Sequence, residues 1–309
     1  MNALNPNHVE ELAAALGTKP GLIEKDWYVV RALGVLASLD LADATPVFSG
    51  GTSLSKGWGI IKRFSEDIDF KVIPPAATSA AANRNQRRAF RKRILSALTS
   101  NEFELVDDPL VGNESQFFAA DLAYPSHFAT GQGLRPHLRV EMSFHAPALQ
   151  PISRPLQSLM AKAQKQPSEI SSFPCVDPIE TAADKLSALG WRVCTRKRGT
   201  QGDDPAIIRH LHDLAALESR IEGAPEFAAL VRQIAEKDAG RGGGEAPQAP
   251  DERFTAMIDL LHHDKEWEKE YETFVLQVSF AGPGEVVLFA DAFAATQRLV
   301  ASVYKDQRS

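Results

Sequence analysis

The sequence predicts an α+β fold with N-terminal helices, a small mixed-sheet core and a larger C-terminal helical domain. Two apolar runs near the N-terminus, over 8–17 and 22–40, follow the 3.6-residue period of a helix. Short segments that alternate apolar and polar residues, as strands do, gather between 47 and 144, and helical patterns dominate the rest. Because 309 residues exceed a typical domain, we expect a boundary that separates 1–146 from 147–309.

The individual elements follow from periodicity and from breaker residues. The expected strands cover 47–48, 68–73, 103–106, 116–124 and 138–144. The expected helices cover 8–17, 22–40, 52–57, 83–100, 178–191, 205–221, 225–238, 251–273 and 285–305. Asp177 and Pro178 form a favourable helix start, and the Gly- and Pro-rich stretch 239–250 is expected to be a flexible connector.

Composition excludes several classes of protein. The hydrophobic fraction of 44% is ample for a core, and no apolar stretch is long enough to cross a bilayer. The first residues lack the basic-then-apolar pattern of an export signal, so we expect a cytoplasmic protein without a membrane partner. Cys175 and Cys194 are too few for a disulfide framework and are expected to be free thiols.

A glycine turn carries the first chemical signal. The segment 48–56 reads FSGGTSLSK. Gly50 and Gly51 have no Cβ, so a triphosphate could approach the backbone N–H groups there closely. Ser53 is the first candidate to donate a hydroxyl to a phosphate, and Lys56 would either contact a phosphate or lie exposed.

Two acids follow in the segment 63–70, RFSEDIDF. In a strand, Asp67 and Asp69 project from the same face, where their mutual repulsion favours a divalent cation such as Mg²⁺. Glu141 lies mid-strand among apolar residues and is the candidate third ligand, although alone it would read as a structural ion-pair partner. Together these residues predict a two-Mg²⁺ site at which a nucleotidyl group is transferred from an NTP.

The segment 84–93 is strongly basic, although the net charge of the chain is −6. On a helix, one stripe of it contains Arg84, Arg87, Arg88 and Arg91. This stripe is either a solvated face or an RNA-binding surface, since phosphates would relieve its self-repulsion. A second basic group lies at 196–198.

The glycine and acid motifs resemble the signature of the AbiEii/AbiGii nucleotidyltransferase toxins, MenT-like members of the polymerase-β-like superfamily. The segment 23–30, IEKDWYVV, is similar to the helical lead-in of that family. The segments 183–189, ADKLSAL, and 209–214, RHLHDL, are similar to its later motifs, so that the resemblance spans roughly 20–215. His210 stands where the family often has aspartate.

The resemblance implies specific roles and partners. Lys185 would contact the NTP, and Asp213 would belong to the active site, either by orienting that lysine or by acting as a base. Members of the family add nucleotides to the 3′ end of tRNA. The chain is therefore expected to be a toxin that blocks tRNA charging and translation and is paired with a separately encoded antitoxin.

Two other hypotheses remain open from the sequence. One is a nucleotidyltransferase that modifies a small molecule, such as an antibiotic, or a protein hydroxyl. The other is a non-catalytic relative that only binds a nucleotide or a partner. The acids at 67, 69 and 141 argue against a non-catalytic relative. The basic segment 84–93 would distinguish an RNA acceptor from a small-molecule or protein acceptor.

Overall fold

We describe the fold from a computed structural model of the chain. It describes residues 4–41, 44–75, 79–129, 134–241, 245–282 and 284–304. The chain forms two compact units, Met1–Asp177 (unit 1) and Pro178–Ser309 (unit 2).

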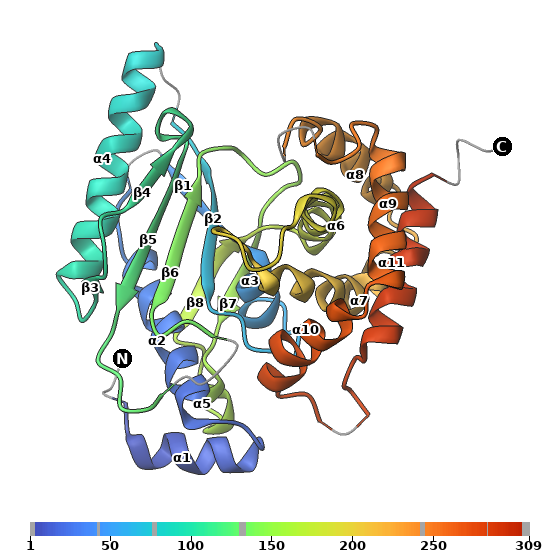
Figure 1. Cartoon of the computed structure of the whole chain (residues 1–309). Helices are drawn as coiled ribbons and strands as arrows, with labels where there is room; N and C mark the ends of the chain where they lie inside the picture. Colours follow the sequence, from blue (N-terminus) through green and yellow to red (C-terminus); the bar gives the residue numbers. More distant parts are fainter. Residues whose placement is uncertain are drawn as a thin grey trace. The chain divides into compact units, whose positions relative to one another are not determined.

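Unit 1 is an α+β unit built on one sheet (Figure 1). Its helices are α1 (Pro6–Ala15), α2 (Pro20–Ala37), α3 (Gly50–Lys56), α4 (Ala80–Thr99) and α5 (Leu159–Ala163). Its strands are β1 (Thr45–Ser49), β2 (Asp67–Ile73), β3 (Glu104–Leu105), β4 (Leu110–Gly112), β5 (Phe117–Ala123), β6 (Leu138–Ser143), β7 (Ile152–Leu156) and β8 (Ile170–Cys175).

The sheet is mixed, as the sequence predicted. Its strand order is β3-β5-β6-β2-β1-β8-β7, and β4 also pairs with β5. β2 pairs with β6, and β1 with β8, in parallel, whereas the other pairs are antiparallel. In β2, Ile68 and Phe70 are buried while Asp67 and Asp69 stay partly exposed, so the alternation of the sequence separates the two faces of the strand.

The expectation of helices alone after residue 146 is wrong for two segments. β7 and β8 lie beyond it and complete the sheet, where β8 lies between β1 and β7. Phe173 of β8 explains why this segment joins the core, because its ring packs against those of Phe48 and Phe70. β4 was also not predicted, although it supplies an edge pairing to β5.

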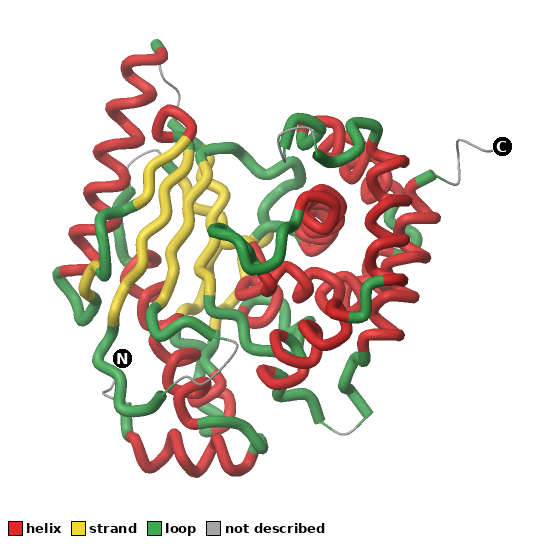
Figure 2. Tube along the Cα trace, viewed as in Figure 1, coloured by secondary structure: helices red, strands yellow, loops and turns green. Residues whose placement is uncertain are grey.

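Unit 2 consists of helices and loops in the described residues, and Figure 2 shows the strands confined to unit 1. Its elements are α6 (Pro178–Thr195), η2 (Pro205–Ile208), α7 (Arg209–Ile221), α8 (Pro225–Lys237), α9 (Pro250–His263), α10 (Glu266–Phe274), η3 (Leu276–Val278) and α11 (Phe289–Val303). The helix expected over 251–273 is two helices, because the backbone at Asp264 is extended.

The core of unit 2 forms around α6, which packs against α7, α8 and α9. Gly190 permits the close approach of α9, since a Cβ there would lie 2.9 Å from the Phe254 ring. Arg253 is buried, and its guanidinium donates to the backbone carbonyls of Pro247, Ala235 and Gln248. A buried cation is tolerated here because its donors are hydrogen-bonded.

The basic group at 196–198 is largely neutralised within unit 2. Arg196 donates to Glu270 and Asp203, and Arg198 pairs with Glu270 and Asp264. Both guanidinium groups also lie over the ring of Trp267, at 4.8 and 4.5 Å from its centroid. These two arginines are therefore structural ion-pair partners rather than a free polyanion-binding group.

Two further sequence expectations have an outcome in the structure. Cys175 and Cys194 are free cysteines, as expected, and burial raises the pKa of each thiol to about 11. In the described part of the chain, no helix has the length and apolar character needed to span a membrane.

Candidate active site

The acids of β2 and β6 lie on one face of the sheet. The register of these parallel strands places Asp69 opposite Glu141 and Asp67 opposite Arg139. On the other side of β2, Asp69 is opposite Ser49 at the end of β1. Because register partners project from the same face, the three predicted acids share that face.

Gly50 is required by the position of Asp69. Gly50 has φ +74°, a left-handed conformation that favours glycine, and a Cβ there would overlap Oδ2 of Asp69. The first turn of α3 is also hydrogen-bonded to β2, since the Thr52 hydroxyl donates to the Asp67 carbonyl oxygen at 2.5 Å. The predicted glycine turn and acid pair are thus in direct contact.

Two other residues of α3 that were predicted to bind phosphate are buried. Gly51 is buried, and Ser53 is 1% exposed. Ser53 lies close enough to Cys175 to lower the pKa of that thiol, against the larger effect of burial. Phosphate binding by Ser53 stays a prediction.

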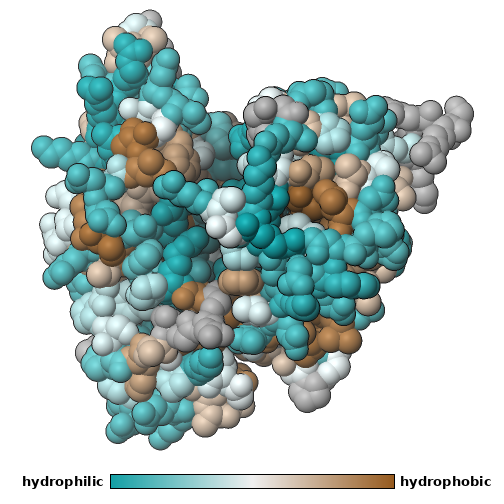
Figure 3. All heavy atoms as spheres, in the orientation of Figure 1, coloured by the Kyte–Doolittle hydropathy of each residue, from teal (hydrophilic) through white to brown (hydrophobic). Residues whose placement is uncertain are grey.

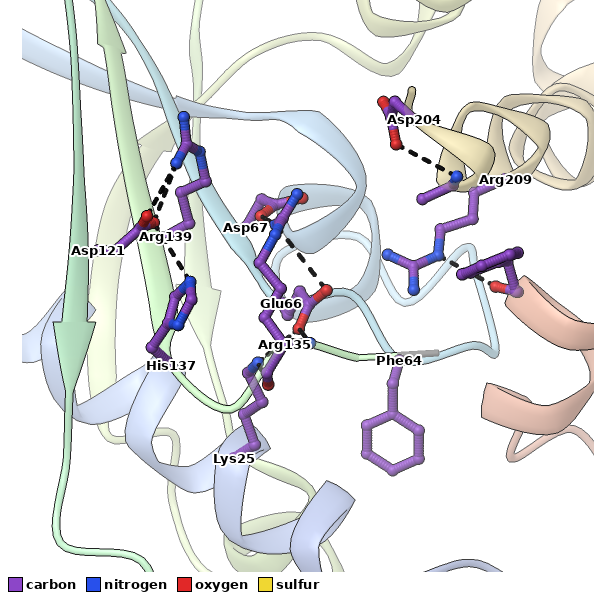
Figure 4. A network of polar contacts seen from close by, with 12 residues as sticks. Lys25, Phe64, Glu66, Asp67, Asp121, Arg135, His137, Arg139, Asp204 and Arg209 are labelled. Atoms are coloured by element: carbon purple, nitrogen blue, oxygen red, sulfur yellow. Dashed lines mark hydrogen bonds and ion pairs between the residues drawn. The ribbon is translucent and has the colours of Figure 1, made fainter. Parts of the chain in front are cut away.

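The face of the sheet that holds Asp67, Asp69 and Glu141 is called the active face below. Two arginines, Arg135 and Arg139, form ion pairs with carboxylates on it (Figure 4). An Nη of Arg135 lies 2.5 Å from Oδ1 of Asp67. Arg139 donates through Nε to Glu141 at 2.6 Å and through Nη to Asp121 at 3.0 Å. Neither arginine was predicted as a site residue, although Arg139 shares one face of its strand with Glu141.

A divalent cation is compatible with the donor chemistry of this face. Asp67 and Asp69 offer the hard carboxylate oxygens that such a cation prefers, and Asp67 forms an ion pair with the guanidinium of Arg135. Among the residues that the structure describes, no group of three or more His, Cys, Asp or Glu side chains is arranged to hold a metal ion. The three-acid shell with Glu141 therefore stays a prediction, and Glu141 here is an ion-pair partner of Arg139.

Buried charged residues of α2 hold the segments that carry Asp67 and Arg135. They were not predicted from the sequence as part of the site. Lys25 is 2% exposed; it forms an ion pair with Glu66, which directly precedes Asp67, and donates to the Arg135 carbonyl oxygen at 2.5 Å. The Arg135 N–H in turn donates to Glu66 at 2.8 Å. Lys25 and Glu66 thus fix the backbone on both sides of the Arg135–Asp67 contact.

The residues on either side of Lys25 anchor other loops. Glu24 is 0% exposed and accepts from the backbone N–H groups of His127 and Phe128. Asp26 accepts from the Leu159 N–H at 2.8 Å and forms a buried ion pair with Lys56. Lys56 is therefore not exposed, and a phosphate contact by it stays a prediction that competes with this partner.

The signal for these charges was present in the sequence. Glu24, Lys25 and Asp26 are consecutive, so their side chains point about 100° apart around the helix and cannot share one narrow polar face. A helix without a polar face is buried on all sides, and its charges then need partners.

Lys185 and Asp213 form a buried ion pair in unit 2. Lys185 Nζ lies 2.9 Å from Oδ2 of Asp213, and the two side chains are 8% and 0% exposed. His212 Nδ1 lies 3.1 Å from the other oxygen of Asp213. The ion pair agrees with the idea that Asp213 orients Lys185, and His212 is a histidine that also contacts Asp213.

The basic helix is confirmed as α4, with Phe90, Ile94 and Leu98 buried. Arg84 and Arg88 are exposed, and Arg84 lies 3.9 Å from Glu114. Arg87 differs, because it lies over the Phe144 ring and donates to the Glu114 carbonyl oxygen. Of the predicted RNA-binding arginines, Arg84, Arg88 and the half-buried Arg91 are therefore freer to reach a ligand than Arg87.

The same part of unit 1 exposes apolar side chains at the sheet edge. Leu105, Val106, Leu110 and Val111 are each 39 to 58% exposed. Figure 3 shows apolar patches over β3 and β4 within a largely hydrophilic face.

Comparison with known proteins identifies the family. The model of the family described as "Nucleotidyl transferase AbiEii toxin, Type IV TA system" matches residues 31–295. The chain therefore belongs to the AbiEii family of nucleotidyltransferase toxins of type IV toxin–antitoxin systems. This family implies an NTP substrate, typically a divalent metal, and an antitoxin partner.

A solved structure shows the same fold. The chain is similar to MenT4, a nucleotidyltransferase toxin from Mycobacterium tuberculosis H37Rv, with a TM-score of 0.65 and 17% identity. The match covers 99% of this chain and 93% of the other. The search of curated proteins gave no match.

Proposed function

We propose that this toxin transfers a nucleoside monophosphate from an NTP to an RNA hydroxyl, the 3′ end of tRNA being the acceptor, and so blocks translation and growth in the cytoplasm. The observation that carries the proposal is the pair Asp67 and Asp69 on one face of β2, with Asp69 packed against the Gly50 turn. The RNA acceptor rests on the exposed arginines of α4.

Each part of the active face has a role in this reaction. Asp67 and Asp69, with Glu141 as the third candidate, would hold Mg²⁺, two ions being expected. When bound, Mg²⁺ supplies charge neutralisation at the phosphates and orients the attacking hydroxyl. The N–H groups of Gly50 and Gly51 would bind the β- and γ-phosphates, with Ser53 and Lys56 as further candidates.

Lys185 and Asp213 are proposed to act on the same substrate. As the family pattern suggests, Lys185 binds the triphosphate and stabilises the charge that develops as pyrophosphate leaves. Asp213 keeps the ammonium in place, since the two groups already form an ion pair. A base role for Asp213 is less well supported, because both of its oxygens have cationic or histidine partners.

The experiment that tests the proposal is label transfer from each of the four α-³²P-NTPs to total cellular RNA and, separately, to purified tRNA. We expect a labelled band in the tRNA size range that is lost with RNase and with EDTA but survives proteinase K. Prior periodate oxidation of the tRNA 3′ terminus should prevent labelling. Label that is removed by proteinase K, or that appears only in small molecules, would contradict an RNA acceptor.

The alternative is transfer to a small-molecule or protein hydroxyl, and the basic helix discriminates between the two. We predict that Arg84→Gln together with Arg88→Gln weakens tRNA binding. The plot of the logarithm of the association constant against the logarithm of the salt concentration has a negative slope. Its magnitude should decrease by about 1.4 to 1.8, because two phosphate contacts are lost. Fluorescence anisotropy with labelled tRNA between roughly 50 and 300 mM KCl, a range in which salt screens exposed charges progressively, would measure the slope.

The matched control for this prediction is Lys19→Gln together with Lys162→Gln. Both lysines are exposed and lie outside α4, so the net charge changes equally while the helix is intact. If both double variants bind tRNA with the same salt dependence, α4 is not the RNA-binding surface and the small-molecule or protein acceptor becomes the better hypothesis.

A further inference from the structure

We propose that Arg135 is a built-in competitor of the divalent cation at Asp67, which leaves that carboxylate only when a nucleotide offers its phosphates. The proposal rests on the proposed function, since it concerns the cation and NTP of that reaction. It makes Arg135 a residue that couples cation binding to nucleotide binding.

The contact between Arg135 and Asp67 is the first argument. The guanidinium lies 2.5 Å from Oδ1 of Asp67 and 3.9 Å from Glu66, so it neutralises the acid to which a cation would bind. A Mg²⁺–oxygen bond is about 2.1 Å long, so a cation on that oxygen would lie within about 5 Å of the guanidinium. Two positive charges at that distance repel each other, and although solvent screens these part-exposed groups, each weakens the binding of the other to Asp67.

The backbone of Arg135 is fixed while its side chain is free to turn. Glu66 accepts from its N–H and Lys25 donates to its carbonyl oxygen, and both of these side chains are almost fully buried. The Arg135 side chain is 41% exposed. Release from Asp67 therefore requires only rotation of the side chain about a held backbone.

Arg139 shows by contrast what a structural arginine looks like on this face. Its guanidinium bridges two carboxylates, those of Asp121 and Glu141, and its side chain is 23% exposed. Figure 4 shows the contact with Asp121. The Arg135 guanidinium has one close carboxylate contact, to Asp67, with Glu66 at 3.9 Å, and its side chain is more exposed. It is thus the arginine that can exchange Asp67 for a substrate phosphate, a bidentate partner that arginine binds well.

The test measures Mn²⁺ binding to the full-length protein by electron paramagnetic resonance, without nucleotide and then with a non-hydrolysable NTP analogue. We expect Arg135→Gln to bind Mn²⁺ at least tenfold more tightly than the natural protein in the absence of nucleotide. Arg135→Lys, which keeps the charge, should stay within about threefold of the natural protein, because a lysine also neutralises Asp67. The control Lys162→Gln removes one exposed charge and should leave the affinity within twofold.

The analogue supplies the second readout. It should tighten Mn²⁺ binding in the natural protein by a factor at least fivefold larger than in Arg135→Gln, since only the natural protein has a guanidinium to relocate. Circular dichroism melts confirm that each variant is folded before its affinity is compared.

The outcomes separate this proposal from the proposed function. If Arg135→Gln and the natural protein bind Mn²⁺ equally while Asp67→Asn loses binding, the competition is overturned but the metal site stands. If no variant at positions 67 or 135 changes Mn²⁺ binding, Asp67 holds no cation and both proposals are overturned. Tighter binding in Arg135→Gln that Asp67→Asn abolishes supports both.

Discussion

Replacing Asp69 with asparagine is expected to lower nucleotidyl transfer by about 10²- to 10³-fold, the cost of removing one preorganised electrostatic group from an active site. Asp69 lies at the centre of the candidate site, opposite Glu141 on one side and Ser49 on the other, and against Gly50. Asparagine has the same shape, so the Gly50 turn can keep its packing while the negative charge is lost. The measurement is the initial rate of α-³²P-NTP incorporation into tRNA.

The control for this variant is Asp108→Asn, which removes an exposed carboxylate from a loop between β3 and β4. It should transfer label at the rate of the natural protein. Thermal melting should show Asp69→Asn to be folded, so that lost activity is not lost structure. Retention of more than about a tenth of the rate in a folded Asp69→Asn would contradict a direct role of this carboxylate, because one missing catalytic group costs more than that.

The active face shows how far sequence reasoning reaches. Alternation alone placed Asp67 and Asp69 on one side of a strand, and the structure confirms it. The register that places Asp69 opposite Glu141 links residues far apart in the chain. The sequence offered Glu141 only as a candidate third ligand, because it lies mid-strand among apolar residues. That Arg139 would bind Glu141 could not be derived in the same way, since alternation gives a side chain its face and not its partner.

The missed elements have a similar cause. β7 and β8 lie in a stretch with two prolines inside strands, Pro155 and Pro174, and proline argues against a strand on local evidence. Their inclusion in the sheet depends on long-range packing, in particular that of Phe173 on the aromatic rings of β1 and β2. The burial of Lys56 likewise depends on Asp26, which is 30 residues earlier in the chain.

Replacing Lys25 with methionine is expected to lower the free energy of unfolding of unit 1 by about 3–5 kcal/mol, the cost of removing one partner from a buried ion pair. Burial lowers the pKa of Lys25, and the carboxylate of Glu66 opposes this effect. Methionine fills a similar volume but removes the ammonium of Lys25 from Glu66, which is 4% exposed, and leaves the Arg135 carbonyl oxygen without this donor. Urea unfolding followed by far-ultraviolet circular dichroism measures the change.

Two further variants separate the ion pair from the loss of a lysine as such. Lys19→Met, at an exposed position before α2, should change stability by no more than about 0.5 kcal/mol. Lys25→Met combined with Glu66→Gln should recover at least about half of the loss, because the buried charge is removed while the amide oxygen can still accept from the Arg135 N–H. A double variant less stable than Lys25→Met alone would mean that Glu66 stabilises unit 1 through groups other than Lys25, and that the α2 lysine does not hold the active face through this pair.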